Sequence, residues 1–510
     1  MQSSFTHPDR AASSVLRSLT AIGFQVELPV AATCVLLDTF DARLHRAGLR
    51  LEYRGGEVGE LVLAGPAGTP TAYLAWAKEL PRFGSDFPIG PFGQRVASLS
   101  EERALIPGLA FTTHTRVASQ RDRRGKVVVS VLLHERPSVD DAEAELPSWV
   151  AEVVGVVGHD TERAEAFDRL ARLGLVPTNG TVADVVARAM GSSLEGHTSV
   201  PTIALDAQQD ALSAYRAVLL NLVSTVRVNL PGTLANTDPE FLHELRVAVR
   251  RTRSVLSQGR GVLPEDVRLH FATAFGQLGT LTGPARDLDV YVMGWDLMVA
   301  PLRLPDPRVL VRVRGEIERR RRAAHAILSV ELGGEACRQT LEDWSGWLAG
   351  TEGVQPKPKP IGPWMARRIA KAHARVVAHG RAITPASPPE ALHDLRKDAK
   401  KLRYLLECFG GLLPRKGRKA FVGQLKVLQD NLGEHQDAEV QLAELRMLAH
   451  DLHARASVDT DALLAMGRLS DLLDRRRREQ RELFVERFAS YDTNANAIML
   501  TTMLDALEQR

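Results

Sequence analysis

An internal repeat constrains the fold of this 510-residue chain more than any other feature of its sequence. The segment FLHELRVAVRRTR at 241–253 returns as ALHDLRKDAKKLR at 391–403. Two further elements recur in the same order: LGTLTGPARDLDV at 278–290 with LQDNLGEHQDAEV at 428–440, and the RRRR runs at 319–322 and 475–478. Three matches in one order indicate a duplication, and each copy is long enough for about four helices. The repeat therefore predicts two packed four-helix bundles.

Hydrophobic periodicity divides the chain into regions. The N-terminal region contains short β-rich runs, such as KVVVSVLLHE, between glycine, proline and charged turns, which is typical of antiparallel strands. In the remainder, apolar residues recur at spacings of three and four, which is typical of α-helices. We predict an N-terminal α+β domain at 1–190, a linker at 191–205, a first helical half at 206–349, a linker at 350–363 and a second helical half at 364–510.

Composition is that of an ordinary globular protein, with 44% apolar and 25% charged residues. No apolar run of about 18 residues is present, and the first residues lack the apolar core of a secretory signal. We therefore expect no membrane partner. Cys34, Cys337 and Cys408 lie far apart with no CxxC pair, which favours a reducing cytoplasm over a disulfide framework.

Positive charge is clustered rather than abundant, since the formal net charge is only +3. At about 100° per residue, Arg246, Arg250 and Arg253 lie on the same side of a helix as His243, and the intervening leucines and valine lie opposite. These four residues form a stripe roughly 15 Å long. The second copy repeats the stripe and widens it: His393, Arg396, Lys400 and Arg403, flanked by Lys397 and Lys401.

Like charges four residues apart destabilise a helix, so a repeated basic stripe indicates an acidic partner or an anionic ligand, although a solvated, salt-bridged face is the alternative. Arginine forks and lysine ammonium groups suit phosphate oxygens, and a histidine near a polyanion can become cationic. A long phosphate polymer would suit two such stripes. We expect it to contact the stripes and two nearby basic clusters: His243, Arg246, Arg250, Arg251, Arg253, Arg319, Arg320, His393, Arg396, Lys397, Lys400, Lys401, Arg403, Arg415 and Lys416.

Nucleic acid and metal ions are weaker candidates as ligands. Aromatic residues make up only 5% of the chain and do not interleave with the stripes, so stacking platforms for single strands are not evident. Nonspecific binding to a duplex backbone stays as an alternative. Acidic residues at matching positions of the repeats are expected to neutralise or orient arginines rather than to bind metal: Asp287, Asp289, Asp437 and Glu439. We predict no metal and no cofactor.

The repeated motifs resemble the CHAD domain, the conserved-histidine α-helical domain. The matching pieces are LHELRVAVRRTRSVL with LGTLTGPARDLDV, and LHDLRKDAKKLRYLLECF with LQDNLGEHQDAEV. The resemblance implies two four-helix bundles with a basic channel or surface between them, and binding of inorganic polyphosphate, often at polyphosphate granules. Val247 departs from the second copy, which has Lys397, so the halves are expected to contribute unequally.

The N-terminal region resembles a CYTH domain, the triphosphate-tunnel fold, an antiparallel β-barrel. The support is LLDTFDARLHRAGLRLEYR at 36–54, with a weaker similarity at 116–135. Catalytic members of that family begin with a strand carrying E-x-E-x-K, whose glutamates hold a divalent metal. The first 20 residues of this chain contain one acid, Asp9, and no such pattern. The resemblance thus implies a tunnel whose bases, with Arg50, Arg54, Lys78 and Arg116 as candidates, bind anions without cleaving them.

We therefore expect a non-catalytic, cytoplasmic polyphosphate-binding protein, with affinity that falls as salt rises. The alternatives are a metal-dependent inorganic triphosphatase or polyphosphatase with a relocated motif, and a protein that binds nucleic-acid backbones.

Overall fold

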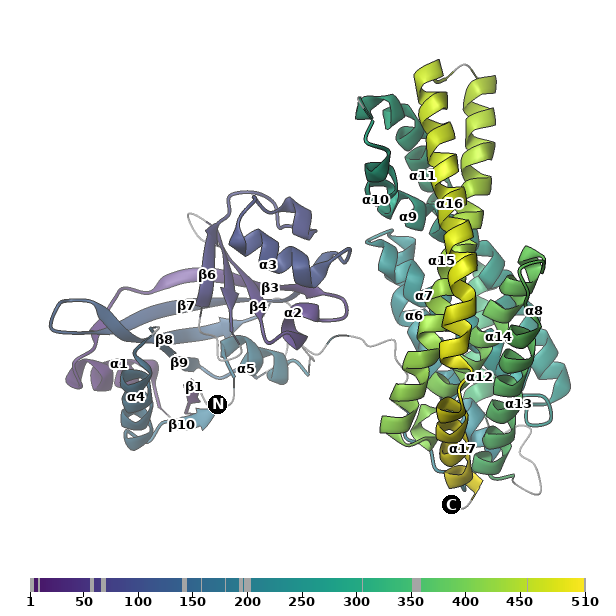
Figure 1. Cartoon of the computed structure of the whole chain (residues 1–510). Helices are drawn as coiled ribbons and strands as arrows, with labels where there is room; N and C mark the ends of the chain where they lie inside the picture. The colour runs from purple at the N-terminus through teal and green to yellow at the C-terminus, as the bar shows by residue number, and fades with distance from the viewer. Residues whose placement is uncertain are drawn as a thin grey trace. The chain divides into compact units, whose positions relative to one another are not determined.

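The computed structural model (Figure 1) describes residues 4–7, 10–55, 59–65, 70–139, 145–156, 158–178, 180–191, 196, 203–304, 306–350, 359–455 and 457–508. These residues fall into two compact units, Met1–Thr198 and Ser199–Arg510. Most of the predicted linkers at 191–205 and 350–363 lies outside the described residues.

The first unit is built on one antiparallel sheet, as predicted for the N-terminal region. Its strands follow the order β10-β1-β9-β8-β7-β3-β4-β5-β6, and β2 pairs with β7. The strands are β1 (Ser4–Thr6), β2 (Gln25–Val26), β3 (Val30–Thr39), β4 (Arg50–Gly55), β5 (Glu60–Ala64), β6 (Pro70–Ala75), β7 (Leu105–Arg121), β8 (Val127–Ser138), β9 (Trp149–Gly155) and β10 (Val176–Thr178). The helices are α1 (Ala12–Ala21), α2 (Arg43–Arg46), α3 (Pro91–Ser100), α4 (Asp160–Arg172) and α5 (Val182–Ala189). This arrangement is consistent with a tunnel-like domain.

The two faces of this sheet have different environments because successive side chains of a strand point to opposite sides. On β8, Val129, Val131 and Leu133 are buried in the core under α1 and α4. The alternating residues Leu132 and His134 point to the other face and line a cavity there. Strand alternation thus separates an apolar core from a partly polar interior.

The second unit is all-helical, as predicted. Its helices are α6 (Ala211–Leu234), α7 (Pro239–Gln258), α8 (Glu265–Leu281), α9 (Gly283–Met293), α10 (Trp295–Val299), α11 (Val311–Gly333), α12 (Glu335–Ala349), α13 (Ile361–Ala382), α14 (Pro389–Cys408), α15 (Arg415–Ala454), α16 (Thr460–Tyr491) and α17 (Asn494–Glu508). Helix α13 starts three residues before the predicted start of the second helical half, after an extended Pro360.

The repeated motifs occupy corresponding helices. The two basic segments form α7 and α14, and the tetra-arginine runs lie on α11 and α16. The middle element differs between copies, because α8 and α9 together correspond to the single long helix α15 in Figure 1. Pro284, in the first turn of α9, has no backbone N–H to continue the helix from α8. Glu434 stands at the matching position, and α15 runs through it without interruption.

The two helical halves share one apolar core. It contains Leu222 and Leu245 from the first half together with Leu402 and Leu425 from the second, all fully or almost fully buried. A second apolar cluster joins α9, α10 and α11 to the distal parts of α15 and α16. The halves therefore interlock, rather than packing as bundles that each enclose a separate core.

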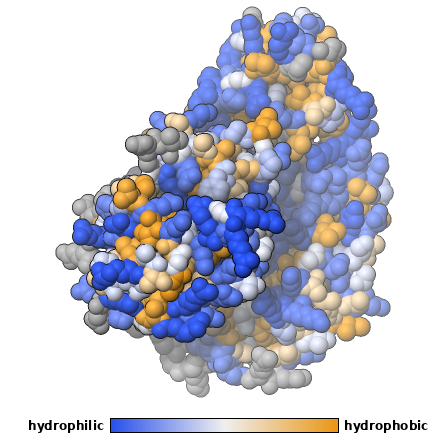
Figure 2. Space-filling model, turned by 90° about the vertical axis from the view of Figure 1, so that its left-hand side faces the viewer, coloured by the Kyte–Doolittle hydropathy of each residue, from blue (hydrophilic) through white to orange (hydrophobic). Residues whose placement is uncertain are grey.

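Surface polarity matches this arrangement. Figure 2 shows hydrophilic residues over most of the face in view, with apolar residues in smaller groups between them. Among the described helices, α6 is long and apolar enough to cross a membrane, but 44% of its apolar window is buried inside the protein. It packs against α7 as part of the shared core.

Candidate anion-binding site

The two basic helices, α7 and α14, pack against each other, so residues far apart in the sequence meet in one place. Helix α7 begins at Pro239, where the Asp238 carboxylate accepts hydrogen bonds from the N–H groups of Glu240 and Phe241. Its leucine face is buried in the shared core. Across the contact, Arg250 Nε lies 3.4 Å from the Tyr404 hydroxyl, to which it donates.

Four cations from the two copies gather at this contact. Arg246 and Arg250 come from α7, and Arg396 and Lys400 from α14, and all four side chains are half-buried. Burial, together with the positive charges of Arg396 and Arg250, lowers the pKa of Lys400 to about 7. Burial, together with the charge of Arg250, lowers the pKa of Arg246 to about 10. Burial and the charge of Arg250 also lower the pKa of Arg396, while the charge of Asp437 opposes that shift.

The lowered pKa values of these cations indicate that they lack enough anionic partners. A buried cation with enough anionic partners would keep or raise its pKa. Among the residues that the structure describes, no carboxylate lies within 4.0 Å of a charged nitrogen of Arg246, Arg250 or Lys400. The three groups therefore repel one another with their charges uncompensated by ion pairs. We call Arg246, Arg250, Arg396 and Lys400 the central cluster.

Two carboxylates border the central cluster. Asp437 Oδ1 lies 3.6 Å from Arg396 Nη2. Burial raises the pKa of both Asp287 and Asp437, while the neighbouring cations oppose that rise. The negative charge of Asp287 also raises the pKa of Asp437, so the corresponding acids of the two copies influence each other. Asp437 thus pairs with one cation of the cluster, whereas Asp287 forms no ion pair among the described residues.

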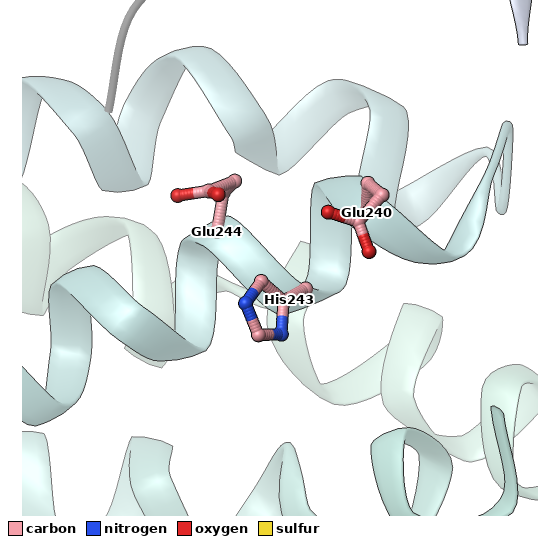
Figure 3. A group of neighbouring side chains, drawn as sticks. All are labelled: Glu240, His243 and Glu244. Atoms are coloured by element: carbon pink, nitrogen blue, oxygen red, sulfur yellow. The ribbon is translucent and has the colours of Figure 1, made fainter. Parts of the chain in front are cut away.

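The motif histidines lie at the edge of the central cluster and have different surroundings. His393 Nδ1 lies 2.5 Å from Gln436 Oε1. His243 lies on one turn of α7 with Glu240 and Glu244, as Figure 3 shows, and one ligand-type atom of each lies within 4.8 Å of the others. In the described residues, this trio is the one group of that kind whose spacing fits a metal ion.

Arg286 lies beside this trio, which makes the trio unlike an ordinary metal site. It also adds a further cation near the central cluster. Its Nη2 lies 3.9 Å from Glu240 Oε1, so a cation already sits beside one of the carboxylates. Burial lowers the pKa of Arg286, and the charge of Arg250 contributes to that shift. Arg286 was not among the predicted site residues. Its position inside the repeated segment 278–290, directly before Asp287, was the signal that could have identified it.

Several predicted residues lie outside the central cluster. Arg251 is buried, and its Nη2 lies 2.7 Å from Glu407 Oε2, so its charge is compensated within the helix contact. Arg253 is exposed beyond the cluster, and Arg403 pairs with Glu407 at 3.3 Å. Elsewhere on α14, Lys397 pairs with Asp394 at 3.1 Å and Lys401 with the buried Asp398 at 3.5 Å.

The additional basic clusters are also separate from the site. Arg319 and Arg320 form ion pairs with Glu316 at 2.7 and 3.1 Å, and Arg320 also pairs with Asp451. Arg415 and Lys416 are exposed at the start of α15, 22 residues before Asp437 on the same helix. At about 1.5 Å per residue, that separation is about 33 Å. The structure thus brings together the inner residues of both stripes and leaves these clusters elsewhere.

Comparison with known proteins supports the motif-based assignment. The CHAD domain family model matches residues 217–446. The crystal structure of the CHAD domain from the plant Ricinus communis is 23% identical, covers 61% of this chain and 96% of its own, and has a TM-score of 0.46. PptA from Streptomyces chartreusis is 14% identical, with 55% and 100% coverage and a TM-score of 0.46.

A third solved structure, the PH1819 protein from Pyrococcus horikoshii, is 11% identical, with 34% and 88% coverage and a TM-score of 0.22. A comparison with curated proteins gives no match. The matched segment contains both basic helices and both acidic elements of the repeat. Residues 217–446 of this chain are a CHAD domain, a domain associated with polyphosphate.

Proposed function

We propose that the helical unit binds inorganic polyphosphate at the central cluster and does not cleave it. The observation that carries this proposal is the meeting of Arg246 and Arg250 with Arg396 and Lys400 without enough carboxylates to balance them. Holding like charges together in a half-buried place costs stability. A polyanion laid across α7 and α14 would remove that cost, because each phosphate oxygen offers the negative charge that the cluster lacks.

The type of anion follows from the chemistry of the cluster. Arginine forks bind two phosphate oxygens at once, and the lysine adds a compact charge. Few aromatic side chains border the cations; Tyr404 offers its hydroxyl to Arg250, so bases of a nucleic acid would have little to stack on. A polymer made only of phosphate needs no such platform. Association with the CHAD family points to the same ligand.

Binding without cleavage is proposed from the residues of the first unit. The short first strand, β1, consists of Ser4, Phe5 and Thr6, so it presents no carboxylate to a metal. Three of the four bases expected to hold a phosphate are already balanced: Arg50 lies 2.8 Å from Asp184, Arg54 lies 2.8 Å from Glu52, and Arg116 lies 2.6 Å from Glu135. The fourth, Lys78, is exposed and lies over the Trp76 ring. We place the protein in the cytoplasm, at polyphosphate granules where these are present.

Charge reversal at the centre of the site tests the proposal. In the double variant Arg250→Glu/Lys400→Glu, affinity for long-chain polyphosphate, measured by fluorescence anisotropy, should fall by about 3 kcal/mol or more, on the order of 100-fold. The matched variant Arg415→Glu/Lys416→Glu changes the net charge equally at the far end of α15. Circular dichroism establishes that both variants keep their helices. Equal losses in the two variants would mean that general charge, and not this site, attracts the polymer.

Two further measurements separate the alternatives. Incubation of the protein with tripolyphosphate and Mg²⁺ or Mn²⁺ should release no phosphate above the buffer control. Release that is lost on Lys78→Ala substitution would favour the triphosphatase alternative. Competition between polyphosphate and duplex DNA at one salt concentration should favour polyphosphate. A tighter complex with DNA would reverse that order and favour a nucleic-acid ligand.

A further inference from the structure

The first unit encloses a cavity of about 200 Å³ on the face of its sheet opposite α1 and α4. Strands β3, β4, β7, β8 and β9 form its floor, and the start of α5 closes one end through Thr181 and Val182. Its size is below the roughly 300–1,000 Å³ of most small-molecule sites, so it fits a compact ligand. Independently of polyphosphate binding by the helical unit, this cavity has the properties of a ligand site.

The charges in the cavity wall are mainly negative. The ionisable residues that line it include Glu27, Glu52 and Glu152 but only one arginine, Arg54. Arg54 Nη2 lies 2.8 Å from Glu52 Oε2, so this one positive charge is already paired. The wall therefore has a negative excess, which disfavours phosphate and favours a cation.

Glu152 is the deepest of these acids. It is 7% exposed, and its Oε1 accepts the backbone N–H of Val182. Burial raises its pKa, but the neighbouring His134, the Val182 N–H and the charge of Arg50 lower it more, so that the pKa lies below the usual value. A buried, ionised carboxylate in a cavity is a strong attraction for an ammonium group.

His134 provides a second, independent indication of a ligand. It is 8% exposed, and its Nδ1 lies 2.9 Å from the Thr115 hydroxyl. Its Nε2 is buried without a hydrogen-bond partner among the described residues, and the nearest carboxylate oxygen, on Glu152, is 3.7 Å away. Buried polar atoms are rarely left unsatisfied, so a polar group of a ligand is expected to reach this nitrogen.

The rest of the wall is apolar. Phe111, Val117 and Leu132 line the interior, and two strongly exposed residues stand at the mouth, Leu28 at 84% and Val30 at 64%. Large apolar side chains at a cavity mouth favour a ligand with an apolar body. None of the cavity acids belongs to the three-residue group with metal-type spacing that the described residues contain, which lies on α7.

We propose that this cavity binds a small organic cation, an amine with a short apolar body, rather than a phosphate compound. The ammonium group would lie near Glu152, and the apolar body would pack between Phe111 and Leu132. The degenerate tunnel would then have exchanged an anion-binding interior for a cation-binding one.

Calorimetric titration of the full-length protein with three probes of similar size tests this proposal: phenethylamine, 2-phenylethanol and phenylacetate. We expect the amine to bind at least tenfold more tightly than the alcohol, and the carboxylate not to bind. Glu152→Gln should remove the preference for the amine over the alcohol. Since this change also affects the Val182 contact, a second variant is needed that leaves the charges intact.

Ala32→Phe is a variant that leaves the charges intact. Ala32 lines the cavity, and a phenyl ring there would fill the space. The matched control is Ala31→Phe, one residue earlier on β3, which points to the other side of the strand and is exposed. Ala32→Phe should abolish amine binding while Ala31→Phe retains it. The proposal is overturned if the amine does not bind, if both variants behave alike, or if tripolyphosphate occupies the cavity in competition with the amine.

Discussion

The proposed binding of polyphosphate should depend on pH through Lys400, and the size of that dependence follows from the surroundings of this side chain. Burial, then Arg396 and Arg250, lower its pKa from 10.5 to about 7 in the free protein. A bound polyanion would stabilise the ammonium form and raise that pKa. Binding should therefore take up a proton above neutral pH, and affinity should increase as the pH falls.

The size of the effect follows from the fraction of Lys400 that carries a charge. With a pKa of about 7, about 90% of the side chains are protonated at pH 6 and about 10% at pH 8. The affinity for long-chain polyphosphate should thus rise by roughly tenfold from pH 8 to pH 6, equivalent to ~1.4 kcal/mol. Internal phosphate groups of a long chain stay charged throughout this range, so the ligand itself contributes little.

Lys400→Arg supplies the matched comparison. Arginine keeps its charge at these pH values and already stands at the corresponding position of the first copy, Arg250. Anisotropy titrations at constant ionic strength should show a shallower pH dependence in the variant. Because other groups on the protein and the ligand can also respond to pH, the difference between the two proteins is the relevant measure. Identical slopes would refute the assigned role of Lys400.

Stability of the unliganded protein should change in the opposite direction. The unfolded chain holds the Lys400 proton up to a pKa of 10.5, whereas the folded protein releases it near 7. Between these values the unfolded state binds more protons, so the free energy of unfolding should rise with pH. Denaturant titrations at pH 7 and pH 9, compared with Lys400→Arg, measure this contribution.

Three other substitutions have expected outcomes. Arg251→Ala breaks the buried pair with Glu407 and should lower the free energy of unfolding by about 3–5 kcal/mol. The folded fraction of this variant should bind polyphosphate normally. A loss of affinity without a loss of stability would contradict the structural role of Arg251. Asp437→Asn removes a negative charge beside the central cluster and should raise the affinity several-fold at low salt, a gain that shrinks as salt is added. Gly380→Ala places a methyl group against the Phe488 ring and should destabilise the fold by about 1–3 kcal/mol in thermal unfolding, with unchanged affinity; normal stability would mean that the ring moves aside.

The sequence predicted the helical region and the side of α7 that is buried, because apolar spacing fixes which face of a helix meets the core. It could not show which helices meet. The contact of α7 with α14 separates Arg250, which faces the other cations, from Arg251, which pairs with Glu407. One residue of difference in position along the helix decides whether an arginine joins the central cluster or forms an ion pair within the helix contact.

The basic runs outside the site could have been interpreted more accurately. Glu316 stands three and four residues before Arg319 and Arg320, a spacing at which opposite charges pair on a helix. The contribution of Asp451 was not predictable, because it depends on how α15 packs against α11. Similarly, Arg50, Arg54 and Arg116 could be named from the sequence as candidates for the first unit, but the acids that pair with them could not, because that pairing depends on neighbouring elements.

The shared core of the helical halves changes what the duplication means for folding. An isolated half would expose the apolar residues that the other half now covers, including those around Leu245 and Leu402. Neither copy is then an autonomous folding unit, and the helical region is expected to unfold in one cooperative transition. A backbone cut between the halves would leave two fragments that fold only together, as an obligate heterodimer. The intact protein is then equivalent to such a heterodimer whose two subunits are joined by a covalent tether.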